Sequence, residues 1–195
     1  MKRAVLALLL CPGGLIAQEA RPMEQHTHGS GFLSISVAGA EFTLSLAVPG
    51  TDIVGFEHPA ADDEDRALVA VAISDLTNPL ELFVVPEEAG CFAVSANVTL
   101  VDGAHSHDGE GAADNQEQGD AVSSTSEETT EPHTEFQAEY LIRCQDPDAV
   151  DDVRFDYFER FENAEELVIE VQSIQGERSF SVARETPLAN LAGMF

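Results

Sequence analysis

Hydrophobic and polar residues alternate in two neighbouring stretches near the start of the chain. Leu33, Ile35 and Val37 are separated by serines, and the run from Phe42 to Val48 alternates in a similar way. A period of two is typical of a strand that buries one face. The short segment Ala38-Gly39-Ala40 suits a turn, so residues 32–48 predict a β-hairpin.

A helical period replaces this alternation after residue 61. Asp62-Asp63-Glu64-Asp65 places four acids where a helix N-terminus favours negative charge. Apolar residues then recur on one helical face: Leu68, Val69, Ala72, Ile73 and Leu76. Asn78-Pro79 ends the run, so we predict a helix over residues 62–76.

The remaining runs predict further strands with short helices between them. Residues 80–85 and 92–101 are expected to pair with each other, residues 136–144 to form a long strand, and residues 167–174 and 178–183 to form a last hairpin around Gln175-Gly176-Glu177. Asp146-Pro147-Asp148 favours a turn or short helix, residues 153–155 are a brief apolar run, and residues 157–161 are a short helical segment. This mixture predicts an α+β fold of antiparallel hairpins with short helices.

Residues 102–132 have a different composition. They contain nine acids, no Lys or Arg, and almost no large apolar side chains. Such a segment cannot bury enough surface to offset its ordering entropy, so we predict a disordered acidic insert. It separates two halves, about 26–101 and 133–187, which we expect to be pseudo-symmetric within one domain over 18–195, although their sequences show no convincing repeat.

The first 17 residues have the plan of a bacterial secretory signal peptide. Lys2 and Arg3 precede an apolar run from Ala4 to Leu10, and Leu15-Ile16-Ala17 is a suitable cleavage site. A buried N-terminal helix is one alternative, and a lipoprotein signal at Cys11 is another. No other apolar run is long enough to span a membrane, so we predict an exported, periplasmic protein without membrane insertion.

Charge excludes one class of partner. The formal net charge is −27, while 44% of the residues are hydrophobic and 23% charged, as in ordinary globular proteins. Loss of the leader removes two cations and no acid. A chain this acidic repels phosphates, which argues against binding to nucleic acid or anionic lipid.

Two cysteines remain after the leader is removed, Cys91 and Cys144. In an oxidising compartment they are expected to form a disulfide, worth roughly 4 kcal/mol on the chain-entropy model. A two-cysteine metal or redox site is the alternative, which the absence of a CxxC spacing disfavours.

Six histidines carry the candidate chemistry. They are His26, His28, His58, His105, His107 and His133. The side chains of residues two apart in an extended segment point the same way, so each HxH pair can bind one metal ion. Neutral imidazoles suit Zn²⁺, and none of the six lies in the middle of an apolar strand face. Solvated surface histidines are the alternative, and the insert with His105 and His107 is equally a charged linker or a weak metal-capturing segment.

Catalytic signatures are absent from the sequence. There is no HExxH, GxSxG, phosphate loop or GxGxxG, and the carboxylates are too numerous for any pair to be specific. We therefore expect a protein that is not an enzyme.

Several motifs follow one another in the order found in a known family. They are His26-Thr27-His28-Gly29, Ile53-Val54-Gly55-Phe56-Glu57-His58, Ala89-Gly90-Cys91, the His- and acid-containing insert, His133-Thr134-Glu135-Phe136 with Cys144, and Phe158-Glu159-Arg160-Phe161. From about His26 to Ala183 the chain resembles the ZrgA-like zinc-regulated periplasmic proteins, long catalogued as a domain of unknown function.

The resemblance implies a pseudo-two-fold α+β fold that holds zinc through three histidines. By motif these are His28, His58 and His133, with His26 as the contender for the place of His28. It also implies weaker sites in the insert, where this chain has only His105 and His107. The implied role is periplasmic zinc acquisition or buffering, with the solute-binding protein of a zinc ABC importer as partner. The rival hypotheses are a cell-envelope interaction module with incidental metal binding and a three-histidine zinc hydrolase.

Overall fold

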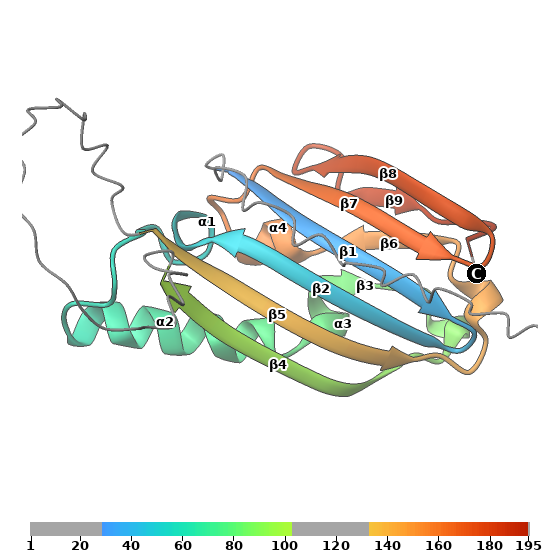
Figure 1. The fold of residues 1–195 in the computed structure, drawn as a ribbon, viewed down its shortest axis with the longest axis horizontal. Coiled ribbons are helices and arrows are strands. Elements are labelled where there is room, and N and C mark those ends of the chain that lie inside the picture. Colours follow the sequence, from blue (N-terminus) through green and yellow to red (C-terminus); the bar gives the residue numbers. More distant parts are fainter. Residues whose placement is uncertain (1–28, 103–132, 195) are drawn as a thin grey trace, which may run out of the picture.

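A curved six-stranded sheet forms one layer of the computed structural model, which describes residues 29–102 and 133–194 (Figure 1). The strand order is β4-β5-β2-β1-β7-β8. The strands are β1 (Ser30–Ala38), β2 (Glu41–Pro49), β4 (Phe92–Asp102), β5 (Thr134–Arg143), β7 (Glu166–Ser173) and β8 (Gly176–Ala183). The fold is α+β and mainly antiparallel, as predicted.

The alternating runs of the sequence form the centre of this sheet. β1 and β2 pair as the predicted hairpin, and residues facing inward from β1, such as Leu33 and Ile35, are buried while the serines between them are not. The predicted last hairpin is β7 and β8, with its turn one residue earlier, at Ile174-Gln175. An alternating strand buries one face only, so this sheet has one solvated face.

The central pairings join segments far apart in the chain. β2 lies antiparallel to β5 from Glu41↔Arg143 to Pro49↔Glu135, and β1 lies parallel to β7. Strands from both sides of the insert are therefore mixed within one sheet, with β5 between β4 and β2 and with β7 beside β1. The arrangement is compatible with pseudo-symmetric halves, which stay a prediction.

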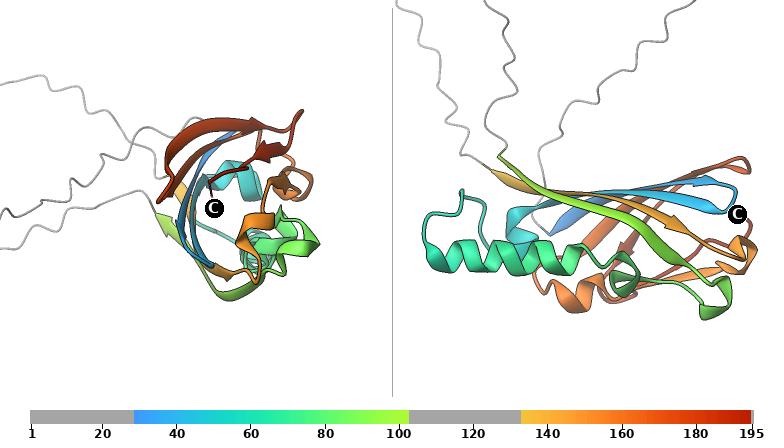
Figure 2. Two further views of the ribbon diagram at one scale, coloured as in Figure 1. Left: turned by 90° about the vertical axis from the view of Figure 1, so that its right-hand side faces the viewer. Right: turned by 90° about the horizontal axis from the view of Figure 1, so that it is seen from below.

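A second layer covers the concave face of the sheet (Figure 2). It contains a three-stranded sheet, β3-β6-β9, and the helical segments. Its members are α1 (Gly50–Val54), α2 (Asp63–Leu76), α3 (Pro79–Leu82), β3 (Phe83–Val84), the 3₁₀ turns η1 (Glu87–Ala89) and η2 (Pro147–Ala149), β6 (Asp152–Phe155), α4 (Tyr157–Arg160) and β9 (Leu188–Asn190). The core lies between the layers and includes Phe83, Phe136, Tyr140, Phe155 and Tyr157, all nearly inaccessible to solvent.

The predicted pairing of residues 80–85 with 92–101 is wrong. Pro79 begins the short helix α3, which takes up residues 80–82, and only Phe83 and Val84 form a strand. β3 pairs with β6, where the rings of Phe83 and Phe155 meet edge to face at 5.6 Å. A short apolar run has no period that distinguishes a strand from a helix, and the choice of partner is made by aromatic burial in the core.

The helix predicted over 62–76 is α2. Asp62 caps it, since its Oδ1 accepts the backbone N–H groups of Glu64 and Asp65 at 2.9 and 3.0 Å. The C-terminal part packs on the core through Ala72 and Leu76, but Leu68 is 45% exposed, contrary to its predicted place on the buried face. Leu68 lines a surface hollow together with Val71 of α2, Ile53 and Val54 of α1, and Phe161. The first turns of α2 extend beyond the end of the sheet (Figure 2).

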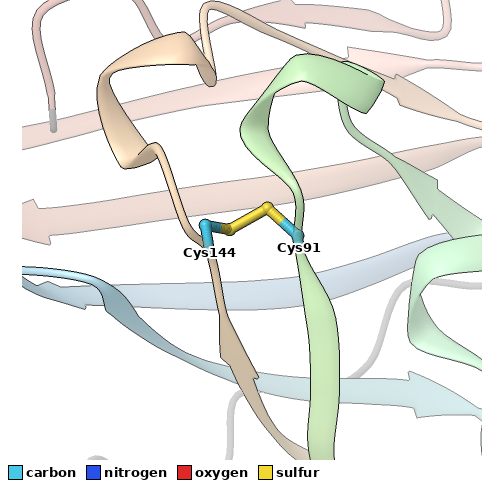
Figure 3. The surroundings of a disulfide bond; sticks show 2 residues. All are labelled: Cys91 and Cys144. Atoms are coloured by element: carbon cyan, nitrogen blue, oxygen red, sulfur yellow. A yellow bond between two sulfur atoms is a disulfide. The ribbon is translucent and has the colours of Figure 1, made fainter.

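The predicted disulfide is present. Cys91 and Cys144 are bonded where β4 begins and β5 ends (Figure 3). The long strand predicted over 136–144 is β5, extended at its start to Thr134. The predicted turn at 146–148, the apolar run at 153–155 and the helical segment at 157–161 correspond to η2, β6 and α4.

The signal peptide predicted over 1–17 lies outside the described ranges, as does the disorder predicted for 102–132 except at Asp102, which is the last residue of β4. Within the described ranges, no helix is long and apolar enough to cross a membrane.

Candidate metal centre

The loop between α1 and α2 lies against the start of β5. The backbone N–H of Thr134 donates to the carbonyl oxygen of Glu57 at 2.8 Å, which joins the loop to the residue after His133. Gly50 allows this approach, since a Cβ atom there would lie 2.3 Å from Thr134 Oγ1 and 2.7 Å from the carbonyl oxygen of Phe56. Glycine is therefore required where β2 runs into α1.

His133 is held through one ring nitrogen. Its Nδ1 lies 2.5 Å from Oε2 of Glu57, and the other carboxylate oxygen, Oε1, accepts from the hydroxyl of Thr51 at 3.2 Å. The His133 side chain is 48% exposed and that of Glu57 is 18% exposed. The pair is thus anchored on its Glu57 side and open to solvent on its His133 side.

His58 is held in a similar way by a different acceptor. Its Nδ1 lies 3.1 Å from the carbonyl oxygen of Pro59, while Oδ2 of Asp65 is 3.9 Å away. The imidazole stacks on the ring of Phe56, with centroids 4.6 Å apart and planes 13° from parallel. A carbonyl oxygen accepts only, so this hydrogen bond places a proton on Nδ1, and Nε2 is the nitrogen that would bind a metal ion.

Gly29 is fixed at the beginning of β1. Its N–H donates to Oδ1 of Asp52 at 2.8 Å, and its carbonyl oxygen accepts from the backbone N–H groups of Glu165 and Glu166, both at 2.8 Å. Asp52 is 1% exposed and its Oδ1 also lies 3.4 Å from the hydroxyl of Thr51. Thr51 therefore connects the carboxylate that holds Gly29 with the carboxylate that holds His133.

α1 is supported from its other side by the segment after α4. The side-chain amide of Asn163 donates to the carbonyl oxygen of Thr51 at 3.2 Å. This segment is in turn fixed by Arg184, whose guanidinium donates to the carbonyl oxygens of Phe158 and Phe161 at 2.5 and 2.6 Å. The motif Phe158-Glu159-Arg160-Phe161 thus packs behind the centre and supplies no metal-binding group to it.

Burial and charge beneath the centre disfavour ionisation of the core tyrosines. Burial raises the pKa of Tyr157 well above its ordinary value, and the charge of Asp52 raises it further. Burial likewise raises the pKa of Tyr140. Neither phenol supplies an anionic ligand at neutral pH.

The structure describes two of the six histidines, His58 and His133, and brings both to the Glu57 loop. His26, His28, His105 and His107 lie outside the described ranges. Among the residues within those ranges, no three His, Cys, Asp or Glu side chains converge to hold a metal ion.

Sequence reasoning missed the carboxylates of this region. In the sequence, Glu57 belongs to the motif around His58, and no pattern distinguishes Asp52 from the many other acids. The available signal was the position of Glu57 directly beside a candidate ligand. Its contact with His133, 76 positions away, depends on the tertiary structure.

The fold and this region define an α+β protein in which two partly exposed histidines, His58 and His133, each engage an oxygen acceptor through Nδ1. The other nitrogen of such an imidazole suits a divalent metal ion. The chain belongs to the ZrgA family of zinc uptake proteins, whose family model matches residues 25–191. A comparison with curated protein sequences finds no match. The role of the protein therefore lies in zinc uptake, and the family is not a known family of enzymes.

Proposed function

We propose that this protein binds Zn²⁺ in the periplasm through His28, His58 and His133, and that it buffers the ion or hands it to the solute-binding protein of a zinc ABC importer. The leader over residues 1–17 would direct its export. The bound ion is cargo, and no reaction is part of the proposal.

The observation that carries the proposal is that both described histidines, His58 and His133, form a hydrogen bond through Nδ1. Each engages a hydrogen-bond acceptor through Nδ1 and keeps Nε2 available. Zinc binds the neutral imidazole, and a ligating histidine usually donates its other N–H to a carboxylate or carbonyl oxygen. The contacts of His58 and His133 through Nδ1 meet the second of these conditions.

Gly29 supports the third ligand. It follows His28 directly, and neighbouring Cα atoms are about 3.8 Å apart. The three hydrogen bonds of its backbone groups tie this point of the chain to Asp52, to Glu165 and to Glu166 at the start of β7. A hollow lined by Gly29, Thr51, Asp52, Gly55, Asn163 and Glu165 opens beside it and gives a polar, acidic surface for the approach of a cation.

The insert supplies the secondary sites of the proposal. Asp102 and Thr134 are partners in the β4–β5 ladder, so the insert begins and ends at the same end of the sheet as Glu57 and His133. His105 and His107 follow Asp102 closely in sequence. We propose that they and the neighbouring carboxylates capture zinc weakly near the central site.

Equilibrium zinc titration of histidine variants tests the central site. The triple variant His28→Ala, His58→Ala, His133→Ala is expected to lose tight binding, and each single variant to weaken it, because each removes one of three nitrogen ligands. The matched control His105→Ala, His107→Ala removes two histidines and should keep the tight site. Tight binding that persists in the triple variant contradicts the assignment, and loss only in a variant of His26 replaces His28 with that residue.

A further inference from the structure

Glu57 occupies a position between the two segments that carry the described histidines. It precedes His58 in the loop, its backbone carbonyl binds the N–H of Thr134 at 2.8 Å, and its carboxylate binds Nδ1 of His133 at 2.5 Å. A single residue therefore holds both the side chain of His133 and the backbone next to it. Two attachment points define the orientation of the ring better than either does alone.

The carboxylate of Glu57 is itself oriented. Thr51 donates its hydroxyl to Oε1 at 3.2 Å, which leaves Oε2 directed to His133. Thr51 belongs to α1, a short helix whose start is closely packed against Thr134 and the carbonyl of Phe56. With its side chain only 18% exposed, Glu57 is held by the fold.

This contact determines which nitrogen of His133 can bind a metal. A carboxylate oxygen that faces Nδ1 at this distance accepts its proton in a hydrogen bond, so in the neutral imidazole Nε2 is the nitrogen that can bind a metal ion. Hydrogen bonds to a charged acceptor are stronger than those to a neutral carbonyl. His58 has the neutral version of the same arrangement, with the carbonyl oxygen of Pro59 at 3.1 Å.

We propose that Glu57 is a positioning residue for zinc binding, which acts through His133 by fixing its tautomer and ring orientation and does not itself contact the metal. This inference rests on the proposed zinc site, but only on residues whose contacts the structure shows. It assigns Glu57 the part played by carboxylates behind metal-binding histidines in other proteins.

The test compares Glu57→Ala and Glu57→Gln with the wild type in zinc titrations. Loss of such a partner lowers metal affinity by about 10- to 100-fold, so we expect this loss for Glu57→Ala. Glu57→Gln keeps an oxygen that can accept from Nδ1 and should recover most of the affinity. Glu88→Gln makes the same change of charge at an exposed site in η1, near the disulfide end of the sheet, and should bind zinc like the wild type.

Two spectroscopic measurements separate positioning from other roles. The ¹⁵N shifts of His133 in the metal-free wild type should report the tautomer protonated at Nδ1, and Glu57→Ala should mix the tautomers. The visible spectrum of the Co²⁺-loaded protein should be the same in Glu57→Gln as in the wild type. A changed Co²⁺ spectrum would make Glu57 a direct ligand and overturn the inference.

The remaining outcomes are also decisive. Unaltered zinc affinity in folded Glu57→Ala overturns the inference while leaving the zinc site intact. Failure of the wild type to bind zinc overturns the proposed function, in which case the ¹⁵N shifts still show whether Glu57 sets the tautomer of His133. If Glu57→Ala does not fold, two measurements still decide whether Glu57 positions His133: the tautomer of His133 in the wild type and the Co²⁺ spectrum of Glu57→Gln.

Discussion

The carboxylate of Glu57 engages Nδ1 of His133 in the same way as the backbone carbonyl of Pro59 engages Nδ1 of His58. Both acceptors engage Nδ1, at 2.5 and 3.1 Å, and both leave Nε2 for a ligand. The difference is that the carbonyl of Pro59 is local to its histidine, whereas Glu57 comes from another element. The orientation of His133 therefore depends on the docking of the loop on β5, and that of His58 depends mainly on its own loop.

The two tyrosines provide a test at the residue scale. Tyr140 and Tyr157 are the only tyrosines and the chain has no tryptophan, so tyrosinate absorbance reports on them alone. Burial raises the pKa of both phenols, whereas in the unfolded chain they ionise near about pH 10. The neutral phenols thus contribute stability that is fully present below about pH 10 and is lost as the pH rises further.

We therefore expect tyrosinate absorbance and loss of circular dichroism to appear together in an alkaline titration. The measurement is a simultaneous record of both signals, with free tyrosine as the reference. Ionisation of either residue near pH 10 in a folded protein would contradict its burial.

At the scale of elements, the strand pair β4–β5 has the disulfide at one end and the candidate metal centre at the other. They pair from Phe92↔Arg143 to Asp102↔Thr134, with the disulfide beyond the first of these pairs and His133 beside the last. The ten residues of β5 span about 33 Å at roughly 3.3 Å per residue. The bridge and His133 therefore stand at opposite ends of the strand pair.

Removal of the bridge should lower stability and spare zinc binding. The bond joins residues 53 positions apart, and its loss in Cys91→Ser, Cys144→Ser should lower the free energy of unfolding by up to about 4 kcal/mol. Denaturant unfolding gives this difference, and zinc titration of the folded variant should match the wild type. Weakened zinc binding in the folded variant would show that the two ends of the strand pair are coupled.

At the scale of the whole molecule, zinc should stabilise the folded protein. A ligand that binds only the folded state adds about 2.7 kcal/mol at a concentration 100 times its dissociation constant. We expect the melting temperature to rise with zinc, and to rise less at about pH 5.5 than at about pH 7.5, because protons compete for the imidazole nitrogens.

Mg²⁺ at the same concentration is the control for non-specific cation binding to a chain of net charge −27. The triple histidine variant should show no shift with zinc beyond that seen with Mg²⁺. An unmoved melting temperature in the wild type would favour the rival hypothesis of an envelope interaction module in which metal binding is incidental.

The sequence by itself determined the features that depend on neighbouring residues. Alternation predicted the β1–β2 hairpin, two runs around Gln175-Gly176-Glu177 predicted the β7–β8 hairpin, and the acidic start with apolar spacing predicted α2. The disulfide between Cys91 and Cys144 was likewise predicted from the sequence. The order of motifs predicts the zinc uptake family, which the family model over residues 25–191 confirms. Periodicity carries this information because it states which face of an element is apolar.

Only the tertiary structure decided which elements meet. The tertiary structure pairs β1 in parallel with β7, pairs β3 with β6 and not with β4, and leaves Leu68 of α2 exposed. It also placed Glu57 on His133 and Asp52 on Gly29. These contacts join distant residues, and their choice depends on how much apolar surface and how many polar groups the whole arrangement satisfies at once, which no local pattern records.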